Sequence, residues 1–172
     1  MTRSDNDKTG LDQAGEALFD FAVERNDVKT LMAYLPGETK CRPATVEYEL
    51  QILKIASTGW ALSFFMENNP YREQLAEIFW KRIHAFSNDL SETTGLMIGQ
   101  NIDYFQNIRK RLDQYITALQ DKPESSEPAA VIGPEFARLC GDVDDVFAIM
   151  TGSRMFIITV ARIREYLDSL EL

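Results

Sequence analysis

The chain has 172 residues, of which 45% are hydrophobic and 26% are charged, and its formal net charge is −9 at pH 7. A chain of this length and composition can bury a substantial apolar core, which excludes an intrinsically disordered or fibrous protein. We therefore predict one folded domain over residues 1–172, with residues 1–10 disordered.

The acidic charge is concentrated at the two ends of the chain. Residues 1–49 carry 10 acidic and 6 basic groups, and residues 121–172 carry 10 and 5, whereas the middle is neutral. Nucleic-acid affinity depends on cations that displace counterions from phosphates. The single basic cluster, residues 109–111, points in three directions on a helix, so we predict no nucleic-acid partner.

The apolar stretches are short. The longest one without a charge, residues 55–66, is shorter than the ~18–20 apolar residues needed to cross a bilayer, so we predict no membrane association. The amino terminus lacks the apolar core of a secretory signal, and we predict a cytoplasmic protein. Cys41 and Cys140 are expected to be free thiols, although a disulfide between them remains an alternative.

Apolar residues recur every three or four positions along most of the chain, which predicts an all-α, single-domain bundle of six or seven helices. Pro43 and Pro70 are expected to open helices, and Gly95 to stop or kink one. The apolar stripes of the first five expected helices cover residues 11–21, 28–35, 46–64, 71–90 and 98–119.

Residues 121–172 are predicted to form a long crossing loop followed by a helical hairpin. Residues 121–134 contain prolines that we expect to prevent a continuous helix, and two apolar stripes follow at 136–150 and 156–170. Because so short a hairpin cannot hold an independent core, it must dock on the earlier helices, and the loop is not a domain boundary.

Pairs of small residues lie within otherwise bulky helices, at Gly59 and Ser63, at Gly95 and Gly99, and at Gly152 and Ser153. Glycine inside a helix costs about 1 kcal/mol relative to alanine, so a compensating contact is expected. Close helix crossing is the favoured explanation, and a ligand pocket is the alternative. The candidate pocket residues are Gly59, Trp60, Ser63, Phe64, Gly99, Tyr104, Phe105 and Arg154.

No catalytic or metal-binding set is visible. The single histidine, His84, continues a polar stripe with Glu77 and Lys81, which favours a solvent-exposed helix face over a proton-transfer site. We therefore predict no catalytic residues, no metal and no cofactor, and lean against an enzyme.

Three acids, Asp142, Asp144 and Asp145, form the densest carboxylate cluster. In a continuous helix Asp142 would pair with Arg138, which disfavours a divalent-cation site. The alternative is a negative surface for a basic partner, to which Glu135, Asp168 and Glu171 would contribute.

Aromatic residues exceed what thin helical stripes must bury. Phe19, Phe65, Tyr71 and Trp80 lie beside the expected stripes, so a second apolar face is available for another chain or a second copy. Our leading hypothesis is a non-enzymatic helical bundle that binds another protein, as an adaptor, inhibitor, chaperone or regulator, through an aromatic patch and an acidic surface. The alternative hypothesis is a bundle that binds a small molecule or cofactor in an apolar pocket near Gly59 and Gly99.

Overall fold

The computed structural model describes residues 3–170 and confirms the predicted all-α bundle, with seven helices and no strand in that range. The helices are α1 (Arg3–Val23), α2 (Asn26–Ala33), α3 (Pro43–Phe65), α4 (Arg72–Ile98), α5 (Tyr104–Gln120), α6 (Pro128–Cys140) and α7 (Val146–Asp168). Helix α1 already begins at Arg3, so most of the segment we expected to be disordered is helical. Its polar residues extend a helix whose later turns are docked, and extension costs much less than nucleation.

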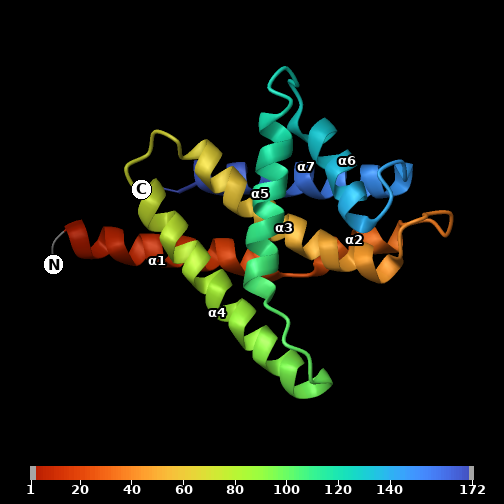
Figure 1. Ribbon diagram of the computed structural model, residues 1–172. Coiled ribbons are helices and arrows are strands. Elements are labelled where there is room, and N and C mark those ends of the chain that lie inside the picture. The colour runs from red at the N-terminus through yellow and green to blue at the C-terminus, as the bar shows by residue number, and fades with distance from the viewer. Residues whose placement is uncertain (1–2, 171–172) are drawn as a thin grey trace.

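Helix α3 lies at the centre of the bundle and contacts all six other helices (Figure 1). It begins at Pro43, as predicted, because the fixed φ of proline suits the first helical turn. Its uncharged second half is apolar on nearly every side, which is the pattern of a helix surrounded by protein. One hydrophobic cluster lies between α3 and the α6–α7 pair, and a second lies between α3, α1 and α4.

Helix α4 extends beyond the bundle, and the chain then returns to α5 (Figure 1). Gly99 ends the helix with φ at +67°, a left-handed conformation that favours glycine. The last turn carries three strongly exposed apolar side chains, of which Leu96 is 90% exposed. The α4 tip, residues 96–98, is therefore separate from the core.

The hairpin after α5 differs from the prediction in where α6 begins. Pro128 occupies the first turn and Pro134 lies inside the helix, so the crossing loop covers only residues 121–127. A proline inside a helix leaves the carbonyl four residues earlier without its usual donor. That carbonyl belongs to Ala130, which is exposed, so water can satisfy it.

The break between α6 and α7 also falls earlier than predicted. Gly141 ends α6 with φ at +114°, so the break covers residues 141–145 and Gly152 lies within α7. A Cβ at Gly152 would lie 2.6 Å from Phe136 Cγ, which means that α6 and α7 cross closely here. The contact agrees with close helix crossing, which was the favoured explanation for the small residues Gly152 and Ser153.

Lys54 is a fully buried cation in the middle of α3. Its Nζ lies 3.0 Å from Asp27 Oδ2, donates to the Glu24 carbonyl oxygen at 2.8 Å, and stands 4.5 Å from the centre of the Phe21 ring. Asp27 also accepts two hydrogen bonds from Arg162, at 2.8 and 2.9 Å. A single carboxylate thereby joins α2, α3 and α7.

We expect Asp27→Asn to lower the free energy of unfolding by about 3–5 kcal/mol, because it leaves the buried Lys54 ammonium poorly compensated. Urea denaturation at neutral pH measures this change. Glu47→Gln is the matched control, since its ion pair with Arg25 is exposed and should contribute no more than about 1 kcal/mol. Equal effects of the two substitutions would contradict the assignment.

Candidate functional site

The structure does not bring the predicted pocket residues together. A Cβ at Gly59 would lie 2.2 Å from Trp80 Cζ2, so the space beside Gly59 is filled where α3 and α4 cross. Gly99 lies beyond the α4 tip, with nothing within 4 Å of a Cβ placed there. The structure therefore does not form the predicted pocket between these two glycines. Close packing explains Gly59, and helix termination explains Gly99.

The remaining predicted pocket residues lie in several places. Tyr104 faces Tyr48, with 6.3 Å between ring centres, and Phe105 packs its ring against His84 at 4.6 Å. Ser63 and Arg154 are exposed. Trp60 and Phe64 do belong to one surface feature, which also includes residues that the sequence did not single out.

Gly59→Ala tests the crossing of α3 and α4. Alanine favours the helix by about 1 kcal/mol, but its methyl group would enter the Trp80 ring, and overpacking of this kind costs about 1–3 kcal/mol. We expect a net loss of stability, measured by thermal denaturation, and recovery on adding Trp80→Leu. Gly37→Ala is the control, because a Cβ at that position meets nothing within 4 Å. Stabilisation by Gly59→Ala alone would refute the contact.

A large groove runs between the ends of α3 and α7, beside the start of α6. We name it the α3–α7 groove, and its volume is about 1030 Å³. Its apolar lining comprises Trp60, Phe64, Phe65, Pro128, Ala129, Phe156, Ile157, Val160 and Ala161. Three helices therefore supply one apolar surface.

Aromatic rings form the wall of the α3–α7 groove. Trp60 stacks on Phe64 with 4.9 Å between ring centres and 15° between planes, and it contacts Phe156 at 5.3 Å. Phe64 is nevertheless 57% exposed, and Ile157 on α7 is 54% exposed. The groove thus combines the buried Phe156 and the partly buried Trp60 with two large apolar side chains that remain more than half exposed.

Carboxylates predominate at the rim of the α3–α7 groove. Glu127, Glu165 and Asp168 line it together with a single cation, Arg164. Arg164 Nε lies 3.8 Å from Asp168 Oδ2, and its guanidinium stands 5.7 Å from the centre of the Phe65 ring. Within the described chain no ion pair reaches Glu127 or Glu165, so the rim carries net negative charge.

Asp145, predicted as part of a negative surface, is buried instead. Its Oδ1 caps α7 by accepting from the backbone amides of Phe147 and Ala148. Its Oδ2 accepts from the Thr39 hydroxyl and from the amides of Lys40 and Cys41, at 2.6–3.0 Å. Burial alone would raise the pKa of Asp145, but these hydrogen bonds outweigh it and lower the pKa well below its usual value.

Asp142 and Asp144 remain near the surface, in the turn before α7. Asp142 accepts from the amide of Asp144 at 2.9 Å and lies 3.9 Å from Lys40 Nζ. It does not pair with Arg138, because the helix has already ended and Arg138 is bound to Glu135. These two acids adjoin the start of α7, whereas the α3–α7 groove lies beside its second half.

The lowered pKa of Asp145 predicts how stability depends on pH. The ionised carboxylate stabilises the fold above its unfolded-state pKa, which is usually near 3.8, and this contribution is lost as the pH falls toward the lower folded-state pKa. We expect Asp145→Asn to cost about 2–3 kcal/mol at pH 7. The cost should shrink below about pH 4. Urea denaturation at pH 7 and pH 3 measures both values, with the exposed Asp144→Asn as the control. A cost independent of pH would contradict the assignment.

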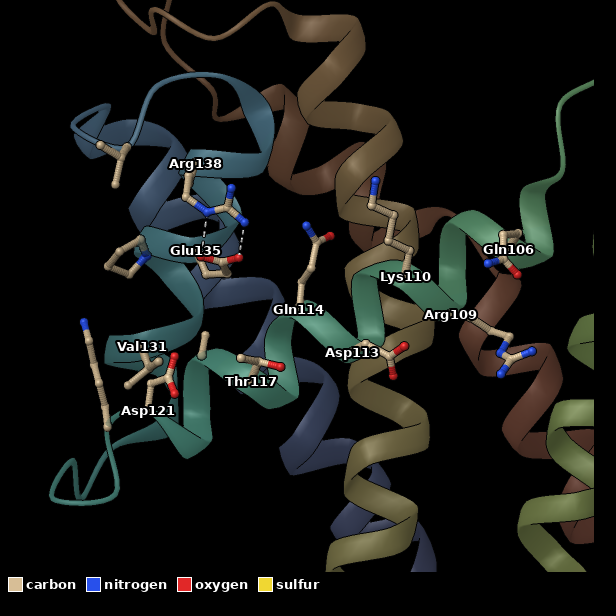
Figure 2. A pocket seen from close by; sticks show the side chains of 14 residues that line it. Gln106, Arg109, Lys110, Asp113, Gln114, Thr117, Asp121, Val131, Glu135 and Arg138 are labelled. Atoms are coloured by element: carbon tan, nitrogen blue, oxygen red, sulfur yellow. Dashed lines mark hydrogen bonds and ion pairs between the residues drawn. The ribbon is translucent and has the colours of Figure 1, made fainter.

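A second groove, of about 680 Å³, lies between α5 and α6 (Figure 2). Glu135 and Arg138 are bound to each other on α6, across the groove from Gln114 on α5. Its lining mixes four cations with three anions: Arg109, Lys110, Lys122 and Arg138 with Asp113, Asp121 and Glu135. Arg111, from the predicted basic cluster, instead turns inward and binds Glu49 at 2.6 and 2.8 Å. Positive and negative side chains are therefore mixed on this surface, and neither sign of charge predominates strongly.

The groups that most often carry catalysis are dispersed or inaccessible in residues 3–170. That range holds no group of three His, Cys, Asp or Glu side chains placed to bind a metal. Cys41 and Cys140 are buried free thiols, as predicted, and burial raises the pKa of each, which disfavours the reactive thiolate. His84 is exposed, and its Nε2 lies 3.4 Å from the amide nitrogen of Asn88.

Helix α7 is, within the described chain, the one helix long and apolar enough to cross a membrane by length and composition. Its most apolar 18-residue window has a mean hydropathy of 1.5, and 39% of that window is buried. Arg154 and Arg162 interrupt this helix, so it contains no uncharged stretch as long as residues 55–66. Here α7 packs one apolar face on α3 and α6 and leaves further apolar residues, such as Met150 and Ile157, exposed.

The chain matches no protein-family model, and no curated protein or solved structure is significantly similar to it.

Proposed function

We propose that this protein binds another protein, and that the α3–α7 groove receives an amphipathic helix of the partner with basic residues beside its apolar face. Binding of a helix in an apolar groove is a common mode of recognition, in which apolar side chains three, four and seven residues apart act as anchors. The groove runs beside residues 156–168, about 18 Å of helix, which matches three turns of a partner helix.

The observation that carries the proposal is the exposure of Phe64 and Ile157 beside the buried Phe156. Phe64 is held in place by its stack on Trp60, so little side-chain entropy is lost when a partner covers it. Burying such side chains is favourable at about 25 cal/mol per Å² of apolar area. Aromatic residues in a preformed site are typical of binding hot spots.

The charge of the partner follows from the rim. Glu127 and Glu165 flank the apolar surface, and the charge of Arg164 is offset by Asp168. Lysine or arginine at the edges of the partner helix would face these carboxylates and accelerate association. A second copy of this chain fits less well, because its net charge of −9 would oppose the same acidic rim.

Two synthetic peptides of 16 residues test the proposal. Both contain four leucines and the same lysines and alanines; one is ordered as an amphipathic helix, and the other is scrambled. We expect calorimetry to give a dissociation constant at least tenfold lower for the ordered peptide, weakening with salt. Phe64→Asp and Ile157→Asp should each raise the dissociation constant of the ordered peptide at least tenfold. Each adds a negative charge that would attract lysine, so a loss of affinity reports the lost apolar contact.

Leu96→Asp is the matched control, because it places the same charge at an exposed leucine of the α4 tip, which contributes no residue to the lining of the groove. Its affinity should stay within twofold of the unmodified protein. Equal binding of both peptides, or equal losses in Leu96→Asp and Phe64→Asp, would overturn the proposal. The proposal would also be overturned if the protein dimerised or bound phosphatidylcholine vesicles, and if Phe64→Asp but not Leu96→Asp abolished that association.

A further inference from the structure

A second apolar cavity lies on the other side of α3, where residues of α4 line it. Figure 1 shows α4 leaving the bundle. It has a volume of about 260 Å³ and lies between α3, α4 and the start of α5, beside the end of α1. We name it the α3–α4 slot. It shares no lining residue with the α3–α7 groove.

The slot has a buried aliphatic floor and half-exposed walls. Ile52, Ile55 and Ile108 form the floor and are at most 4% exposed. Phe86 and Leu90, on α4, are 37% and 40% exposed. A molecule inserted between the floor and these walls would remove apolar surface from water on both of its sides. The slot is therefore suited to a flat apolar ligand.

Tyr48 supplies a hydrogen-bonding group at the slot. Its hydroxyl oxygen accepts from Asn107 Nδ2 at 3.0 Å, and its own proton has no acceptor among the residues that the structure describes. Burial raises the pKa of Tyr48, so the hydroxyl keeps this proton at neutral pH. It can donate to a carbonyl or ether oxygen of a ligand.

The charges at the slot cancel. Arg25 and Glu47 both line it and are bound to each other, and no other ionised side chain belongs to its lining. A charged ligand would lose its hydration without gaining a free countercharge. Small-molecule pockets combine apolar walls with a few polar groups in this way. The slot's volume of about 260 Å³ lies just below the ~300–1,000 Å³ typical of pockets for drug-sized ligands, so it suits a small ligand.

We propose that the α3–α4 slot binds an uncharged, flat apolar molecule of about the size of a substituted naphthalene, with one hydrogen-bond acceptor directed at Tyr48. Tyr104, which the sequence analysis placed among the candidate pocket residues, lies at this slot and not near Gly59. This binding activity is independent of the protein partner proposed for the α3–α7 groove.

The test uses 6-propionyl-2-(dimethylamino)naphthalene, an uncharged fluorophore with one carbonyl oxygen whose emission shifts to the blue in apolar surroundings. We expect saturable binding to the full chain with a blue shift. Leu90→Trp fills the slot and should weaken binding at least tenfold. Leu96→Trp makes the same substitution at the α4 tip, and binding should stay within twofold of the unmodified protein.

Two further variants decide where the fluorophore binds. Tyr48→Phe removes the hydroxyl group that would donate to the ligand and should weaken binding about three- to tenfold, a decisive result even where Leu90→Trp does not fold. Phe64→Asp alters the α3–α7 groove and should leave binding unchanged. Absence of saturable binding, equal effects of Leu90→Trp and Leu96→Trp, or loss of binding on Phe64→Asp would each overturn the proposal.

Discussion

Because α3 is surrounded by the other helices, its two buried charged side chains, Glu49 and Lys54, must find partners inside the protein. Lys54 binds Asp27 and Glu24 on one side, and Glu49 binds Arg111 of α5. A buried charge without a partner costs several kcal/mol, so these pairs fix how α3 is rotated within the bundle. Glu49 and Trp60 are eleven residues apart, about 20° around a helix of 3.6 residues per turn, so the pair that orients Glu49 also orients Trp60. The wall of the α3–α7 groove thus depends on ionic contacts that lie outside it.

The spacing of apolar residues predicted the helices well where a helix has one apolar face and residues that clearly mark its ends. Pro43 starts α3, and the small residue Gly59 marks a close crossing, as the sequence indicated. The predicted start of α6 and the predicted exposure of Asp145 were wrong, because both depend on tertiary surroundings that the local sequence does not specify. Pro134 is tolerated because the carbonyl it leaves without a donor belongs to the exposed Ala130, and the position of Asp145 requires a loop about a hundred residues away.

The candidate sites were only partly predictable for the same reason. Trp60, Phe64 and Tyr104 were selected as aromatic walls, but the structure distributes them over two cavities on different sides of α3. Ile157 carried no distinguishing signal, because an apolar residue in a periodic stripe is as consistent with a covered face as with an open one. The acids at the groove also differ from the predicted ones. Asp168 was predicted to contribute to a negative surface, but Glu127 and Glu165 line the groove in place of Asp142, Asp144 and Asp145.

The carboxylate of Asp145 serves two segments that are made at very different times. Its bonds to Thr39, Lys40 and Cys41 join residues 104 to 106 positions apart, whereas the amides it caps in α7 are two and three positions away. During synthesis the loop between α2 and α3 emerges first, and its amides lack this acceptor until about a hundred further residues have been translated. The loop between α2 and α3 therefore completes these hydrogen bonds only when the first residues of α7 have been made.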